Sequence, residues 1–303
     1  MGQPLKTLFP YFGGKKSVAP DVWQRLGRPK QYIEPFAGSL AMLMAKPDGA
    51  ASLEVVGDMN GFIANFWRAA KHQPEQVALW ADYPVSHIDQ GARHRLLMEG
   101  RAALGDALQD PEWPGDAKVA GWWLWGQCSW IGSGWCDWWG QVPHVSNAGQ
   151  GIQAAGQVPH VGNADFMTSG GAAAFAWLRK VAARTERTRI IHGDWNRCLN
   201  HHYGGNNTAV FLDPPYLGFE SPYGDVVPTA LQVADWAREH PHLKIAVCGH
   251  IGDYDLPGWD AVQWTRSGNT YGGAGTKDKE CIWYSPACHP AINKQHDLFG
   301  AGA

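Results

Sequence analysis

The sequence has 303 residues, a length that suits one large domain or about two. Its formal net charge is −3, so the chain lacks the overall positive charge that would indicate nucleic-acid binding. No apolar run approaches the roughly 20 residues of a membrane-spanning helix, and the N-terminus lacks the apolar core of a signal peptide. The six cysteines have no C-x-x-C spacing, which is typical of reduced thiols rather than a zinc site. We therefore expect a cytoplasmic protein with no membrane segment and no metal.

Strands and helices alternate at the start of the chain. The expected strands lie at residues 32–34 and 53–58, and the expected helices lie at 40–45 and 62–70. Residues 35–39 form a small-residue loop between the first strand and its helix, where backbone amides at a helix N-terminus receive the polar end of a cofactor. Asp58 ends the second strand, and an acid at that tip is the usual partner of a ribose diol.

The same alternation returns near residue 189. Strands are predicted at 189–194, 209–213 and 244–248, a helix at 229–240, and further strands at 262–264 and 280–284. This pattern predicts an α/β fold with a doubly wound, Rossmann-like sheet. About 120 residues without the pattern precede the strand at 189, which is enough for an inserted domain. We therefore place the sheet domain at residues 1–68 and 186–303 and the insert at residues 69–185.

The insert is rich in tryptophan and poor in charge. Seven of the chain's 17 tryptophans lie at 122–139, and residues 119–178 contain no Lys or Arg. These rings form an aromatic core, or one or two of them stack on bases; glycines beside Trp130 and Trp135 indicate an exposed turn and favour these two for the second role. The hexapeptide GQVPHV occurs at 140–145 and 156–161, where its polar side chains either read base edges or make local turn hydrogen bonds. The candidate base-contacting residues are Trp130, Ser133, Trp135, Gln141, His144, Asn147, His160 and Asn163.

Charge is unevenly distributed in the second half of the chain. Residues 175–200 carry six basic and two acidic side chains, a local net charge of +4, whereas residues 213–260 have a net charge of −6. The basic run is either a solvated helix face or a surface that contacts phosphates. In the second case, Arg184 and Arg187 are its candidate DNA contacts.

The tetrapeptide Asp213-Pro214-Pro215-Tyr216 follows the apolar run at 209–212. Open α/β sheets bind ligands at the carboxyl ends of buried strands, so this position favours chemistry over a simple turn that closes a strand. A carboxylate and the Pro214 carbonyl would both accept hydrogen bonds from an exocyclic amino group of a nucleobase and localise its lone pair. The two prolines would stiffen the loop, and Tyr216 would stack on the base.

Four motifs, in this order, resemble those of one family. Residues 9–15 are similar to its aromatic-x-Gly-Gly-Lys motif, residues 34–39 to its EPF-x-G loop, residues 57–60 to its D-x-N strand tip, and residues 213–216 to its DPPY motif. The chain thus resembles the D12 class (Dam-like) of DNA adenine-N6 methyltransferases over about residues 9–285. The resemblance implies a methyltransferase sheet with an inserted target-recognition domain.

The resemblance also implies S-adenosylmethionine as the methyl donor. Tyr11 would pack against it, and Lys15, whose alternative is a solvated surface lysine, would approach its carboxylate. Gly38 and neighbouring amides would line its methionine end, Asp58 would accept its ribose hydroxyls, and Asp194 with Trp195 would lie near its adenine. The full implied set is Tyr11, Phe12, Gly13, Gly14, Lys15, Glu34, Pro35, Phe36, Ala37, Gly38, Ser39, Asp58, Met59, Asn60, Asp194, Trp195 and Asp213.

Two departures from the family pattern stand out. Dam-like proteins often have Gly-x-Gly in the cofactor loop, whereas this chain has Gly38-Ser39-Leu40. The recognition hairpin of the Dam branch is rich in Arg and Lys, whereas the GQVPHV region carries none. The base sequence that this chain would read therefore does not follow from the resemblance.

The expected activity is site-specific methylation of adenine N6 in double-stranded DNA. The adenine would be flipped out of the duplex and would take the methyl group by direct in-line displacement, without a metal or a covalent enzyme intermediate. Two alternatives remain: a cytosine-N4 methyltransferase, and a DNA-binding protein without turnover. A monomer or a homodimer, an orphan enzyme or a partner of a restriction enzyme, and a nucleoid-associated location in a bacterium or phage-infected cell all agree with the sequence.

Overall fold

The computed structural model describes residues 9, 15–84, 86–129, 135–136, 172–200, 205–217, 229–264 and 280–290. The chain forms two compact units. Unit 1 comprises Met1–Lys16, Ile33–Lys46 and Ser52–His202, and unit 2 comprises Ser17–Tyr32, Pro47–Ala51 and Tyr203–Ala303.

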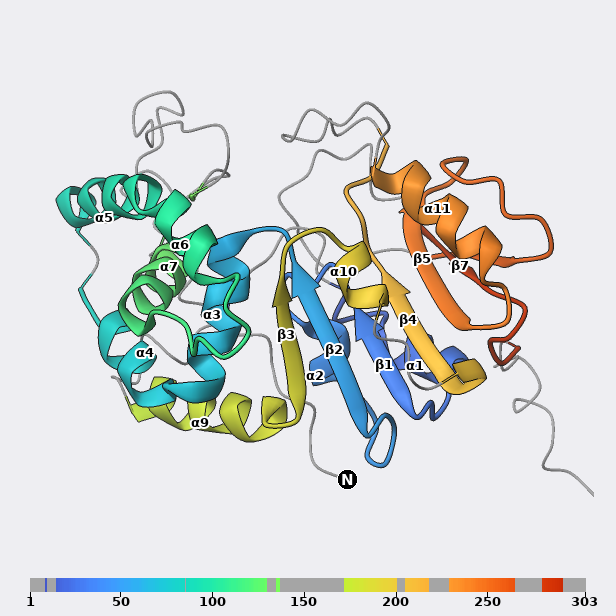
Figure 1. The fold of residues 1–303 in the computed structure, drawn as a ribbon, viewed down its shortest axis with the longest axis horizontal. Coiled ribbons are helices and arrows are strands. Elements are labelled where there is room, and N and C mark those ends of the chain that lie inside the picture. Colours follow the sequence, from blue (N-terminus) through green and yellow to red (C-terminus); the bar gives the residue numbers. More distant parts are fainter. Residues whose placement is uncertain are drawn as a thin grey trace, which may run out of the picture. The chain divides into compact units, whose positions relative to one another are not determined.

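The described strands form a seven-stranded, mostly parallel sheet in the order β3-β2-β1-β4-β5-β7-β6 (Figure 1). Strand β2 pairs parallel with β3, and β4 pairs parallel with β5, whereas β7 runs antiparallel to both β5 and β6. The strands are β1 (Gln31–Glu34), β2 (Leu53–Asp58), β3 (Thr188–His192), β4 (Thr208–Leu212), β5 (Lys244–His250), β6 (Asp260–Gln263) and β7 (Glu280–Tyr284). The predicted α/β class is confirmed, and the sheet is consistent with a Rossmann-like methyltransferase. The inserted recognition domain and its boundaries stay predictions.

Continuous apolar runs produce the central strands. All five residues of β4 are buried, as are the four middle residues of β2, because a parallel strand is covered on both faces. The observed bounds of β2 and β7 agree with the predicted ones, whereas β5 continues two residues beyond its predicted end to His250.

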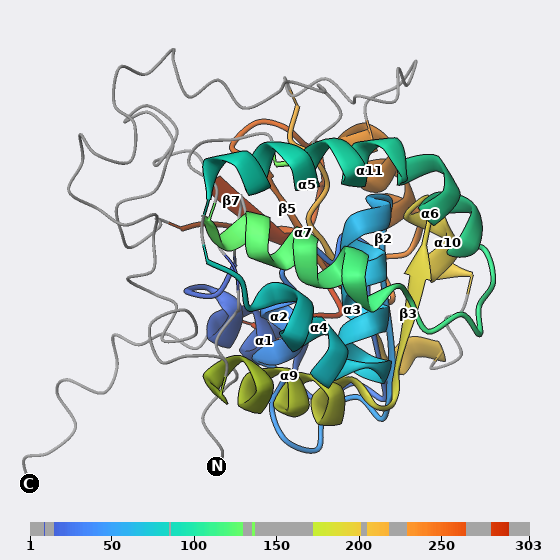
Figure 2. The same cartoon turned by 90° about the vertical axis from the view of Figure 1, so that its left-hand side faces the viewer.

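Helices α4, α5, α6, α7 and α9 of unit 1 lie in the segment at residues 69–185, for which the sequence predicted no elements. Figures 1 and 2 show α7 between α5 and α4, with α9 against the other side of α4, and contacts join each of these pairs. Helix α7 is apolar on nearly all sides and so lacks the one-sided stripe by which a surface helix is detected. The unit 1 helices are α2 (Ala41–Met44), α3 (Gly61–His72), α4 (Pro74–Ala81), α5 (His87–Glu99), α6 (Arg101–Ala107), α7 (Ala117–Ser129), α9 (Ala172–Thr185) and α10 (Asn196–Leu199).

An aromatic cluster fills the core of unit 1. The ring of Phe9 lies 5.4 Å from Phe66 and 5.1 Å from Trp123, and Phe66 lies 4.8 Å from Trp67, measured between ring centroids. Aromatic pairs at such distances add to the hydrophobic gain of burial. The cluster therefore joins α3 and α7 firmly.

Unit 2 has its own core around β4, β5 and β7. Its helices are α1 (Ala19–Leu26), the short 3₁₀ helix η2 (Gly205–Asn207) and α11 (Thr229–Glu239). Arg25 of α1 forms an ion pair with Asp260 at 2.6 Å, and its guanidinium lies 4.2 Å from the ring centroid of Tyr284. These contacts attach α1 to the antiparallel edge of the sheet.

None of the described helices has both the length and the apolar character that a membrane span requires. Nor do the described residues contain a group of three or more side chains suited to hold a metal ion.

Candidate functional site

The loop between β1 and α2 is attached to the tip of β2 by Asp58. The backbone N–H of Gly38 donates to Oδ2 of Asp58 at 2.9 Å, and the N–H of Asn60 donates to Oδ1 at 2.9 Å. The N–H of Ala37 also donates to the carbonyl of Gly57 at 2.8 Å. One carboxylate therefore positions the loop and the first turn of α3, where the Asn60 side chain accepts from the N–H of Phe62 as an N-cap.

Trp67 of α3 holds the same loop through a hydrogen bond. Its indole Nε1 donates to the carbonyl of Gly38 at 2.9 Å, and its side chain is almost fully buried. Both backbone groups of Gly38 are thus bonded within the chain, and its place at the methionine end of a cofactor stays a prediction. Sequence reasoning missed Trp67, because nothing in the local pattern of α3 separates this ring from its buried neighbours.

Ser39 and Leu40 follow at the turn into α2. Ser39 is 6% exposed, and neither its N–H nor its hydroxyl makes a hydrogen bond with another described residue. Leu40 has φ 51° and ψ 32°, the left-handed conformation that a glycine adopts without strain. The backbone path thus persists where the family often has its second glycine, at a cost of about 1–2 kcal/mol that full burial of the Leu40 side chain offsets.

Burial raises the pKa of Asp58 to about 6, although the N–H groups of Gly38 and Asn60 oppose the shift. The residue is only partly covered, as is Asn60, whereas Met59 is exposed. A carboxylate with two backbone donors and remaining lone pairs can also accept from two hydroxyls.

Four other residues of unit 1 were predicted to bind the cofactor and lie among the described residues: Lys15, Phe36, Asp194 and Trp195. Lys15 is 3% exposed, which excludes the solvated surface lysine. Phe36 and Trp195 face each other with ring centroids 6.4 Å apart and planes 20° apart. The carboxylate of Asp194 accepts from the N–H of Asn196 and shapes the turn that holds Trp195. Tyr11, Phe12, Gly13 and Gly14 lie outside the described residues.

Unit 1 therefore contains the groups that S-adenosylmethionine requires. Asp58 offers acceptors for a ribose diol, Ser39 offers uncommitted donors, Lys15 a cation, and Phe36 with Trp195 flat apolar surfaces. These residue types fit the cofactor that the resemblance implies.

In unit 2, the DPPY tetrapeptide follows β4 directly. Asp213 is partly covered, Pro214 is buried, and Pro215 is exposed. The ring of Tyr216 packs edge-to-face against His250 at the end of β5, with centroids 4.7 Å apart and planes 78° apart. Sequence reasoning missed His250 because its predicted strand ended at residue 248.

The Asp213 carboxylate has a phenol as a neighbour. Burial raises the pKa of Tyr254, with smaller contributions from the charges of Asp253, Cys248 and Asp213. The Tyr254 hydroxyl donates to the carbonyl of Cys248 at 3.0 Å and so fixes this part of β5. A positioned carboxylate and aromatic ring at a strand end suit the binding of a flat base that carries an amino group.

Residues 11–90 match the D12 class N6 adenine-specific DNA methyltransferase family. The match includes the loop at residues 35–39, Asp58 and α3, and it confirms the resemblance over this segment. The DPPY tetrapeptide at residues 213–216 lies outside the matched residues. No curated protein matches the chain.

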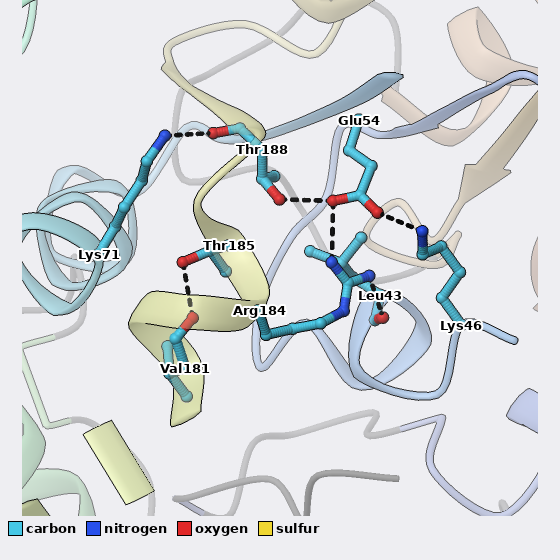
Figure 3. A network of polar contacts seen from close by, with 8 residues as sticks. All are labelled: Leu43, Lys46, Glu54, Lys71, Val181, Arg184, Thr185 and Thr188. Carbon is cyan, nitrogen blue, oxygen red and sulfur yellow. Dashed lines mark hydrogen bonds and ion pairs between the residues drawn. The ribbon is translucent and has the colours of Figure 1, made fainter. Parts of the chain in front are cut away.

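Arg184, a candidate DNA contact, belongs to a network of polar contacts around the carboxylate of Glu54 (Figure 3). Its Nη1 donates to Oε2 of buried Glu54 at 2.9 Å, and its Nη2 donates to the carbonyl of Leu43 in α2 at 2.8 Å. Lys46 and Thr188 reach the same carboxylate at 2.8 Å and 2.6 Å. Burial would raise the pKa of Glu54, but these donors outweigh it and lower the pKa. These contacts give Arg184 a structural role, since its charge holds α2 and α9 against β2, and its contact with DNA stays a prediction.

Trp135 is also part of the core. It is 3% exposed, its indole nitrogen donates to the carbonyl of Trp123 at 3.0 Å, and its ring lies directly over Gly126. This observation favours the aromatic-core interpretation for Trp135 over base stacking. Arg187 is exposed, as a phosphate contact requires. The other candidate DNA contacts, Trp130, Ser133, Gln141, His144, Asn147, His160 and Asn163, lie outside the described residues.

Proposed function

We propose that this chain is a site-specific DNA adenine-N6 methyltransferase that uses S-adenosylmethionine. The observation that carries the proposal is the position of Asp213-Pro214-Pro215-Tyr216 at the end of fully buried β4, in a part of the chain that the D12 match does not include. Two separate segments thus indicate one reaction. Sequence-specific reading of DNA is assigned to the insert at residues 69–185.

Residues of unit 1 would hold the cofactor. Asp58 accepts the ribose hydroxyls, Lys15 balances the carboxylate, and the N–H and hydroxyl of Ser39 bind polar atoms of the methionine end. Phe36 and Trp195 flank the adenine. When bound, S-adenosylmethionine supplies an electrophilic methyl group on a sulfonium.

Residues of unit 2 would prepare the amine. The Asp213 carboxylate and the Pro214 carbonyl accept the two N–H bonds of the adenine N6 group, which withdraws its lone pair from the ring and directs it outward. Tyr216, supported by His250, stacks on the base after it leaves the duplex. Most of the rate enhancement would then come from alignment of the amine with the methyl group, since a positioned pair reacts as an intramolecular one.

The test compares Asp213→Ala and the isosteric Asp213→Asn with the wild type. We expect both variants to lose methyl transfer to DNA by at least about 100-fold, because each removes the anionic acceptor, while S-adenosylmethionine affinity stays within about twofold. Transfer of tritiated methyl groups and calorimetry give the two quantities. Retained turnover in Asp213→Ala would refute the catalytic assignment.

Mass spectrometry of nucleosides from the methylated DNA names the product. N6-methyladenine supports the proposal, whereas N4-methylcytosine would assign the same residues to the cytosine reaction. Binding of cofactor and DNA by the wild type without any transfer would show a binding protein instead.

A further inference from the structure

A cavity of about 570 Å³ lies along β3 within unit 1. Strand β3 is the first strand in the order of the described sheet, so no further described strand covers its outer side. The last turn of α3, residues 108, 109 and 111–113 after α6, residues 186–192 and Arg197 line the cavity. None of these residues belongs to the cofactor loop or to the DPPY tetrapeptide.

The lining is strongly basic. Five cations face two carboxylates, which gives a net charge of +3 with the histidines neutral. The cations are Arg68, Lys71, Arg187, Arg189 and Arg197, and the carboxylates are those of Glu112 and Glu186. Among the described residues, no ion pair involves any of the five. The lining thus carries three positive charges in excess of its carboxylates.

Some of these donors have a structural role on the strand edge. Arg68 Nε donates to the carbonyl of Ile190 at 3.3 Å, Lys71 Nζ donates to that of Thr188 at 2.9 Å (Figure 3), and Arg197 Nη1 donates to that of His192 at 2.7 Å. These bonds satisfy edge carbonyls, as natural sheets require. Edge protection accounts for the position of these three side chains.

Protection of the strand edge does not account for the other guanidinium N–H groups of the lining. Arg68 Nη1 donates to the carbonyl of Asp110 at 2.8 Å, whereas its Nη2 has no acceptor among the described residues. Arg187 and Arg189 are exposed at the mouth of the cavity and make no side-chain hydrogen bond with another described residue. A guanidinium carries five donors in a planar fork that matches two oxygens of a phosphate.

The cations also act on one another. Burial lowers the pKa of Arg68, as do the nearby charges of Arg197 and Arg189, although Asp110 opposes them. Burial likewise lowers the pKa of His192, and Arg197 and Arg68 add to the effect, although the carbonyl of Met59 opposes it. An anion in the cavity would relieve this repulsion.

We propose that this cavity binds phosphate groups, and that they are backbone phosphodiesters of the DNA substrate. The choice of DNA as the source rests on the proposed function. It agrees with the absence of Lys and Arg from residues 119–178, because phosphate contacts must then come from elsewhere in the chain. A net charge of +3 suits two or three phosphodiesters, each of which carries one negative charge.

The test uses the double variant R187Q/R189Q in the full chain. Both side chains are exposed and make no hydrogen bond with another described residue, so the fold should be unchanged. Loss of two phosphate contacts should reduce the slope of log affinity against log salt by about 1.8 and weaken binding of duplex DNA roughly 30-fold at 0.15 M salt. The matched control is R179Q, whose exposed arginine pairs with Glu75 outside the cavity and whose slope should stay that of the wild type.

Inorganic phosphate, added at constant ionic strength, separates the two sources of the ligand. Millimolar phosphate that competes with DNA for the wild type but not for R187Q/R189Q supports the proposal. Tight phosphate binding by the wild type with no effect on DNA affinity would assign the cavity to a free phosphate ester and overturn the DNA source. An unchanged salt slope in R187Q/R189Q, together with no phosphate binding by the wild type, would refute the site altogether.

The readout is DNA binding and needs no turnover. A wild type that binds DNA through this cavity but transfers no methyl group would refute the proposed function alone. A double variant that keeps the wild-type salt slope while the wild type methylates adenine would refute the cavity alone.

Discussion

The assignment of Arg184 to a structural network makes a prediction about stability. Arg184→Gln removes the cation that joins α9 to Glu54 and Leu43 but keeps a shorter, polar and uncharged side chain. If the network is structural, the variant loses folding free energy and keeps its DNA affinity. A DNA-contacting arginine would show the opposite.

The size of the loss follows from the contacts. A hydrogen bond to a charged group contributes about 1.5–3 kcal/mol, and one to a neutral carbonyl contributes about 0.5–1.5 kcal/mol. Glu54 keeps Lys46 and Thr188 as partners, so the full ~3–5 kcal/mol for an abandoned buried charge does not apply. The Arg184 side chain is 20% exposed, which allows water to recover a small part. We expect a loss of about 2–3 kcal/mol in the free energy of unfolding.

Urea denaturation followed by tryptophan fluorescence measures this loss, and the matched control comes from the same helix. The pair between Arg179 and Glu75 is exposed on both sides, at 65% and 42%, so Arg179→Gln should change stability by less than ~0.5 kcal/mol. The reasoning fails if Arg184→Gln unfolds at the wild-type urea concentration, or if its DNA affinity becomes less dependent on salt while its stability is unchanged.

Three further predictions concern unit 1. Because burial raises the pKa of Asp58 to about 6, S-adenosylmethionine affinity should fall about tenfold per pH unit below that value, as the acceptor becomes protonated. Calorimetry between pH 5 and 8 checks this, with Asp58→Asn as a control whose affinity should not depend on pH in this range. A wild-type affinity as independent of pH as that of Asp58→Asn would contradict the prediction. Trp67→Phe should cost about 1–3 kcal/mol and weaken cofactor binding, because the buried Gly38 carbonyl loses its donor; wild-type affinity and stability in urea would count against this anchor. Gly126→Ala should lower stability by about 1–3 kcal/mol and alter the near-ultraviolet circular dichroism, since the new methyl group would overlap the ring of Trp135; an unaltered spectrum would mean that the ring is not packed there.

Much of the sheet could be predicted from the sequence, because a buried strand is a local pattern. The bounds of β2 and β7 came from their apolar runs, and the acids at 58 and 213 were evident as the residues that end such runs. The helices between residues 74 and 129 were not predicted. Helix α7 is apolar on nearly all sides and lies between other helices. Its place depends on those neighbours, so its own sequence did not predict it.

The loop at residues 35–39 was also predicted only in part from the sequence. Its composition indicated a cofactor loop, and the D12 match confirms that resemblance. The hydrogen bonds of Gly38 join it to Asp58, 20 residues away, and to Trp67, 29 residues away. The sequence did not show that Gly38 is held by these two residues.

Arg184 and Arg187 mark the limit of what the sequence determined. By itself the chain specified a basic run, its place before β3, and the chemistry of a guanidinium. Only the tertiary structure separated the two residues, since it places Glu54, 130 positions away, against Arg184 and leaves Arg187 exposed at a cavity. The physical reason is that the partner of a charge is selected by packing between distant segments, whereas the charge itself belongs to one residue.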